Sequence, residues 1–116
     1  MLKISVDYGY AFDVLAIMEV KSKIIGEKNE AYHKLYIEIE EQIGKTKMDI
    51  IINSSEYLNL INTNQKVFDL VDKAQKDNGL AKEVDSANYQ RYLMKTALQK
   101  IFFNNNITEI KLGYNK

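Results

Sequence analysis

A predicted helix without a polar face is the sequence feature that most limits how this chain can fold. Residues 10–25 contain charged side chains, but apolar residues occupy almost every side of the helix that this segment would form. They are Phe12, Val14, Leu15, Ala16, Ile17, Met18, Val20 and Ile24. A helix that is apolar nearly all round has to be covered on several sides by other elements. The segment is therefore expected at the centre of the fold.

The partners of this segment are predicted to be amphipathic helices. Residues 30–43 place apolar side chains at spacings of three and four, with glutamates on the other side. Asn53 and Glu56 form a capping-box-like start to a helix that extends to about Lys76, and an Asn-Gly pair just beyond it ends the helix. The last predicted helix covers residues 81–103.

Residues 48–52 fit two structures. Met48 to Ile52 could form a strand, or they could continue a helix after the break at residues 44–46. The heptad-like spacing of Ile43, Ile50 and Ile51 slightly favours the helix.

Two short alternating patterns at the chain ends predict strands. The apolar residues Leu2, Ile4 and Val6 alternate with polar ones near the start, and Ile110, Leu112 and Tyr114 alternate near the end. We expect these two strands to pair. With 116 residues there is room for one core, so the predicted fold is mainly α. It is a bundle of about four helices in a single domain, residues 1–116, with a small β-sheet made by the N- and C-terminal strands.

Composition excludes several classes of function. The net charge is zero, so the strongly basic surface of a duplex-binding protein is missing, and we expect no nucleic-acid partner. There is no cysteine and a single histidine, which excludes thiolate and multi-histidine metal sites. We expect no metal and no cofactor, although a carboxylate-only Mg²⁺ or Ca²⁺ site stays open. No segment approaches the ~20 apolar residues of a membrane span, so no membrane partner is expected.

Lysine, asparagine and isoleucine are abundant and proline is absent, as is typical of an AT-rich genome. This composition suggests a bacterial or phage origin, and because no leader pattern or membrane span is predicted, the expected location is the cytoplasm of a bacterial cell or a phage-infected host. Such a bias replaces surface arginine by lysine, and Arg91 is the only arginine of the chain.

Polar residues interrupt the apolar faces of three predicted helices. At 100° per residue, Asp13, Asn64 and Arg91 each fall among apolar side chains of their own helix. Asn88 and Lys95 lie beside Arg91 on the same helix face. A buried charge without a partner costs several kcal/mol, so these groups are expected to meet one another or a ligand.

Two interpretations of these residues remain open. In the favoured one the cluster is structural: Asp13 pairs with Arg91, and Asn64 and Asn88 satisfy the remaining groups. In the alternative, Arg91 and Lys95 hold an anionic ligand in a central pocket, while Asp13 or Glu19 takes part in acid–base catalysis. We find no phosphate-binding loop, dinucleotide turn, zinc spacing or nucleophile elbow that would identify a reaction.

The same positions resemble a family of small bacterial and phage proteins that is defined only as a domain of unknown function. The family's opening motif has Gly, then Asp-Lys four residues on, then Ile-Leu-Glu-x-Lys. Its spacing is met here by Gly9, Asp13, Ile17, Met18, Glu19 and Lys21, with Val14 in place of the first lysine.

Three later motifs extend the resemblance over nearly the whole chain. They are met in kind by Asn64, Val67, Phe68 and Asp72, then by Val84, Asn88, Arg91 and Lys95, and at the end by Glu109, Lys111 and Tyr114. Val71 stands where the family has glutamate, which puts any role of that glutamate in doubt here. The resemblance adds weight to these positions and implies no activity.

The function expected from the sequence is therefore a small soluble binding or assembly module with a buried polar network. A homo-oligomer is left open. The alternative is an enzyme or sensor that binds a small anionic metabolite. Its candidate residues are Arg91, Lys95, Asn88, Asp13, Glu19 and Asn64.

Overall fold

The fold is built from helices throughout the part of the chain that the structure describes. A computed structural model of the chain describes residues 5–25, 29–76 and 78–103. In chain order its elements are α1 (Tyr8–Ile25), α2 (Glu30–Ile43), α3 (Lys45–Ile52), α4 (Ser55–Ala74), the 3₁₀-helix η1 (Asn78–Leu80) and α5 (Ala81–Phe103). The prediction of a mainly α fold is confirmed, and residues 48–52 are helical, as the spacing of isoleucines favoured.

The predicted small β-sheet is wrong. The described residues are 90% helical and form no strand or sheet. Val6 forms only an isolated bridge, and it is 39% exposed, so it does not provide the buried face that an alternating strand needs. The second predicted strand, around Ile110 and Tyr114, lies outside the described residues. The α-helices among the described residues number five rather than about four, because residues 45–52 form a helix of their own.

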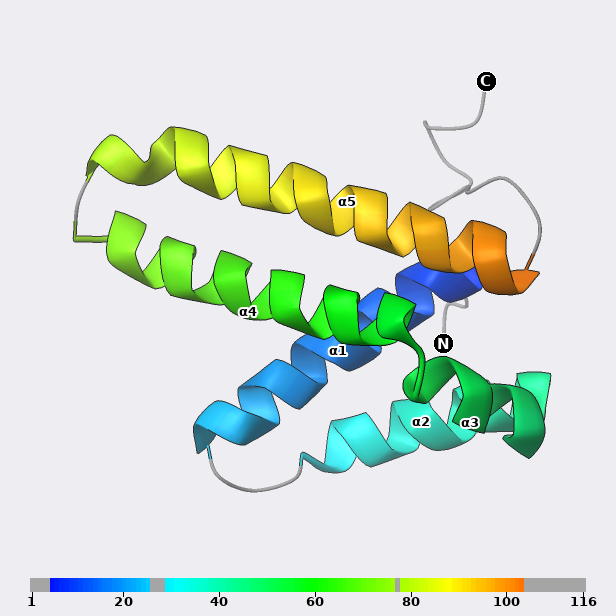
Figure 1. Cartoon of the computed structure of the whole chain (residues 1–116). Coiled ribbons are helices and arrows are strands. Elements are labelled where there is room, and N and C mark those ends of the chain that lie inside the picture. The colour runs from blue at the N-terminus through cyan, green and yellow to red at the C-terminus, as the bar shows by residue number, and fades with distance from the viewer. Residues whose placement is uncertain (1–4, 26–28, 77, 104–116) are drawn as a thin grey trace.

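The helices form a long hairpin with α1 packed across it. Figure 1 shows α4 and α5 side by side and antiparallel, with α1 crossing behind them and α2 and α3 beneath the start of α4. Helix α1 contacts α2, α4 and α5, which confirms its predicted central position. Phe12, Leu15, Ala16 and Val20 of α1 are fully buried in the core. Its final turns extend past this core, and Ile24 is exposed there.

Local sequence explains where the middle helices begin and end. Asn29 caps α2 by accepting from the backbone N–H of Ala31, and Gly44 separates α2 from α3 with a φ of +91° that L side chains rarely adopt. The N-cap of α4 is Ser54, whose hydroxyl accepts from the N–H of Tyr57 at 3.1 Å. The prediction of Asn53 as this cap is therefore wrong by one residue.

Gly9 allows α1 to approach α5 closely. A Cβ atom at this position would lie 2.8 Å from the backbone carbonyl oxygen of Lys95, which is too close for a real contact. The N–H of Gly9 donates to Oε1 of the buried Gln99 at 2.6 Å. Because the first N–H groups of a helix have no partner within it, Gln99 satisfies the start of α1 from a distant part of the chain.

Candidate functional site

Three polar side chains from three helices meet inside the bundle. The amide nitrogen of Asn64, on α4, donates to Oδ1 of Asp13, on α1, at 3.0 Å. The same nitrogen donates to the carbonyl oxygen of Leu60 at 3.0 Å. Nε of Arg91, on α5, lies 3.6 Å from Oδ2 of Asp13. Both oxygens of the Asp13 carboxylate therefore face a partner from another helix.

Arg91 is only partly enclosed by this cluster. Its side chain is 31% exposed, whereas that of Asp13 is 5% exposed. At 3.6 Å the pair is an ion pair that is longer than a hydrogen bond. A guanidinium carries five N–H donors, so Asp13 does not saturate it.

Lys95 lies beside the cluster, in an aromatic setting. It is buried, and its Nζ is 5.6 Å from the ring centre of Tyr10 and 5.7 Å from that of Tyr92. Burial lowers the pKa of Lys95, the charge of Asp13 acts in the opposite direction, and the charge of Arg91 lowers the pKa further. Lys95 is thus electrostatically coupled to the cluster, although the aromatic rings surround its ammonium group.

Two of the six residues singled out by the sequence lie elsewhere. The amide nitrogen of Asn88 donates to the carbonyl oxygen of Val84 in its own helix at 3.2 Å. Glu19 accepts from two tyrosine hydroxyls, at 3.1 Å from Tyr57 and 3.4 Å from Tyr32. The structure therefore brings Asp13, Asn64 and Arg91 together, with Lys95 nearby, and separates Asn88 and Glu19 from them.

Glu19 lies in a tyrosine cluster that joins α1, α2 and α4. Burial is the main cause that raises the pKa of Tyr32 to about 12, and the charge of Glu19 raises it further. Burial and the charge of Glu19, in the same order, also raise the pKa of Tyr57. This arrangement favours the neutral phenols and the three-helix contact that they make.

Alkaline pH is expected to weaken this contact. In the unfolded chain tyrosines release their protons near about pH 10, whereas folded Tyr32 and Tyr57 retain theirs to higher pH. The contribution of Tyr32 to stability is complete below about pH 10 and is lost as pH rises through about 12, and the contribution of Tyr57 also begins to fall above about pH 10. Urea unfolding followed by circular dichroism between about pH 9 and 12 measures the effect.

Two variants test this assignment. Tyr57→Phe should flatten the decline of the free energy of unfolding with pH, whereas Tyr89→Phe, at an exposed tyrosine, should leave it unchanged. Equal slopes in both variants would contradict the assignment.

An apolar groove opens next to the polar cluster. It has a volume of about 330 Å³ and lies between α1, α4 and α5. Its apolar lining comes from Ile17, Val20, Val67, Phe68 and Val71, and its polar lining from Asn64, Asp72, Gln75 and Arg91. Phe68 is 39% exposed and Val71 is 41% exposed, so apolar side chains of α4 are open to solvent in the groove.

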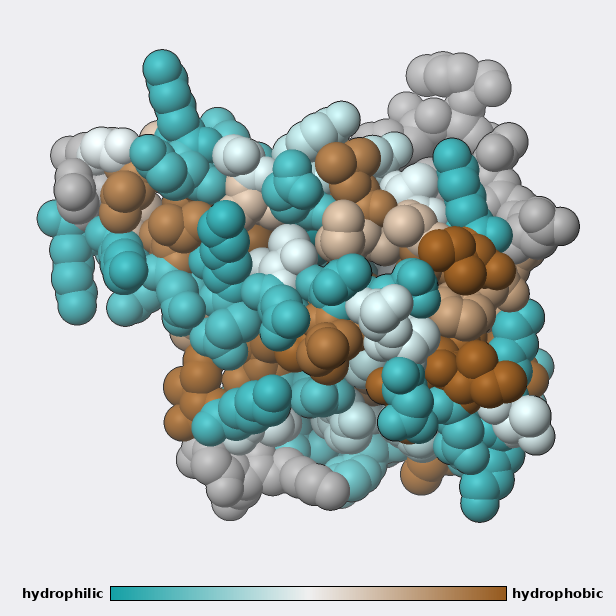
Figure 2. All heavy atoms as spheres, viewed as in Figure 1, coloured by the Kyte–Doolittle hydropathy of each residue, from teal (hydrophilic) through white to brown (hydrophobic). Residues whose placement is uncertain are grey.

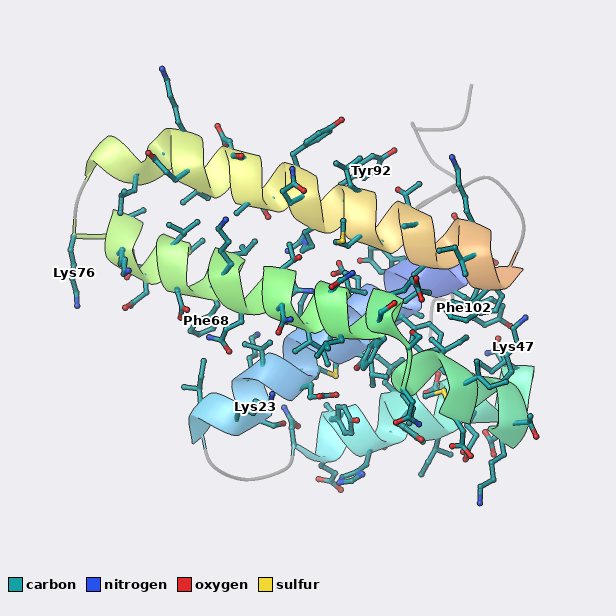
Figure 3. All side chains as sticks on the ribbon, viewed as in Figure 1. Lys23, Lys47, Phe68, Lys76, Tyr92 and Phe102 are labelled. Atoms are coloured by element: carbon teal, nitrogen blue, oxygen red, sulfur yellow. The ribbon has the colours of Figure 1, made fainter. Side chains whose placement is uncertain are left out.

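The figures locate this groove on one side of the hairpin. Phe68 lies on the side of α4 that is turned toward the C-terminal half of α1 (Figure 3). Hydrophobic atoms reach the surface over this part of α1, below the ribbon of α4 (Figure 2). The sequence pattern indicates Asn64 and Arg91 of this lining but not the groove, because apolar residues on a helix have the same spacing whether another helix covers them or not.

Neither the residues around the site nor the comparisons with known proteins identify a cofactor or a family. Among the described residues no group of three or more histidine, aspartate or glutamate side chains could hold a metal ion. None of the described helices is long and apolar enough to span a membrane. No family model, curated protein or solved structure matches the chain. The resemblance to small bacterial and phage proteins stays a prediction.

Proposed function

We propose that this protein is a small binding module and that the groove between α1, α4 and α5 is its binding surface. The observation that carries the proposal is the groove itself, where α4 leaves Phe68 and Val71 uncovered beside α1 and Arg91 of α5 adds a charged group. Binding sites in proteins are generally concave and mostly apolar, with a few placed polar groups. A cytoplasmic location, which the sequence analysis expects, and assembly into a homo-oligomer, which it leaves open, remain parts of this proposal.

The polar cluster is assigned a supporting role. Asp13 holds Arg91 on one side and Asn64 on the other, so it ties the three helices that line the groove. Glu19, the other candidate acid or base, is engaged by two tyrosines away from the groove. For the alternative, an enzyme or sensor for a small anionic metabolite, the supporting observation is that Arg91 lines the groove.

A neutral fluorescent probe tests the groove. We expect N-phenyl-1-naphthylamine, which emits strongly in apolar surroundings, to bind the wild-type protein. Val71→Glu should weaken this binding at least about tenfold, because the new carboxylate would have to lose water or exclude the probe. Leu58→Glu is the matched control: Leu58 is also an exposed apolar residue of α4, but it does not line the groove. Failure of the probe to bind, or equal loss in the two variants, would refute the proposed surface.

A further inference from the structure

The geometry of the groove points to one class of ligand. We propose that the groove binds a linear aliphatic carboxylate, with the carboxylate at the guanidinium of Arg91 and the hydrocarbon chain along α4. This inference rests on the proposed function, since it requires the groove to be the binding surface. It adds the chemical class of the ligand and its direction in the groove.

The shape of the groove favours a narrow, extended ligand. Its α4 wall is one continuous stripe from Asn64 to Gln75, at spacings of three and four residues. The eleven residue steps from Asn64 to Gln75 correspond to about 16 Å along the helix axis. The groove has a volume of about 330 Å³ along this stripe, and a linear ligand can follow it over that length.

Polar and apolar groups follow one another along the groove in a definite order. Asn64 and Arg91 lie together at one end, because both contact Asp13. Val67, Phe68 and Val71 continue the α4 wall, and Asp72 and Gln75 follow at the other end. A ligand that matches this order has an acceptor group at the first end and an apolar body in the middle.

Charge sets the direction of the ligand. Arg91 can donate two parallel hydrogen bonds to a carboxylate, and its ion pair with Asp13 leaves donors available for them. Asp72 lies eight residues after Asn64 on α4, about 12 Å away along the helix axis, and its carboxylate repels an anion at that end of the groove. Asp13 already offsets part of the charge of Arg91, which favours a monoanion such as a carboxylate over a dianionic phosphate.

Competition against the neutral probe tests the inference on the wild-type protein. Decanoate, 1-decanol and decylamine share a ten-carbon chain and differ in the head group. At about pH 8 the carboxylate is ionised. Decanoate should then bind at least about tenfold more tightly than decanol, and decylamine should have the lowest affinity of the three. From hexanoate to decanoate the affinity should rise about fourfold for each added methylene.

Substitution of the arginine tests the assigned contact. Arg91→Met should reduce the affinity for decanoate to that for decanol, with the competition in each protein referred to the affinity of that protein for the probe. Arg91→Lys should recover part of the preference, because it restores the charge without the planar pair of donors. Leu58→Glu should behave as wild type in every competition. The competition on wild-type protein needs no folded variant, so the inference stays testable if Arg91→Met is too unstable to assay.

The outcomes separate this inference from the function on which it rests. If the probe binds but decanoate, decanol and decylamine displace it equally, the carboxylate assignment fails and the binding surface stands. The same conclusion follows if Arg91→Met retains the preference for decanoate. If the probe does not bind at all, the proposed function fails, and the ligand class fails with it.

Discussion

Arg91→Met is expected to lower the free energy of unfolding by about 3 kcal/mol. The substitution keeps a long side chain but leaves the nearly buried carboxylate of Asp13 with Asn64 as its remaining hydrogen-bond donor. Removing one partner of a buried ion pair typically costs about 3–5 kcal/mol. We place this pair at the lower end, because Arg91 is partly exposed and Lys95 remains in electrostatic contact with Asp13.

A double-mutant cycle checks the origin of this loss. Urea or guanidinium unfolding should show that Asp13→Asn combined with Arg91→Met costs less than the sum of the two single variants, because no unpaired carboxylate remains. Lys66→Met, at an exposed basic residue of α4, serves as the control and should change stability by less than about 0.5 kcal/mol. Additive costs, or a loss in Arg91→Met below about 1 kcal/mol, would show that the pair is not the structural tie described above.

Gln99→Met is expected to lower the free energy of unfolding by about 2 kcal/mol. Methionine has nearly the same shape as glutamine, so packing between α1 and α5 is retained. The N–H of Gly9 then loses the side-chain oxygen that it contacts at 2.6 Å and remains buried. An unsatisfied buried donor costs about 1–3 kcal/mol.

The matched control for Gln99→Met is Gln90→Met on an exposed part of the same helix. It should be nearly neutral in the same unfolding experiment. Hydrogen exchange adds a local measurement, because Gln99→Met should speed exchange in the first turn of α1 more than in the middle of α4. Equal stability of the two methionine variants would mean that Gln99 does not serve the start of α1.

Helix positions followed from the sequence because periodicity and helix-ending residues agree. The ranges 30–43 and 81–103 have the bounds that the structure gives α2 and α5. The terminal sheet was overpredicted because three alternating residues do not show whether one face will be buried, and Val6 is 39% exposed. The separation of α3 from α2 depends on the positive φ of Gly44, and the spacing of apolar residues does not predict a backbone angle.

Helical phase also placed the polar cluster, but only in part. It put Asp13, Asn64 and Arg91 on inward faces, and the structure joins them. It could not separate Lys95 or Asn88 from that group, because phase gives the side of a helix and not the direction of a long side chain. The groove depends on how α1 crosses α4 and α5, and that crossing is a tertiary property that the pattern of a single helix does not contain.

The contact between Gly9 and Gln99 affects the order in which the protein can fold during its synthesis. Ninety residues separate the two partners. At a translation rate of about 5–20 residues per second, roughly 5–20 s pass between the synthesis of Gly9 and that of Gln99. During this interval α1, the most apolar segment of the chain, has neither its terminal acceptor nor the cover of α5. Helix α1 can therefore reach its final contacts only after α5 has been synthesised, although it precedes the other described helices in the chain.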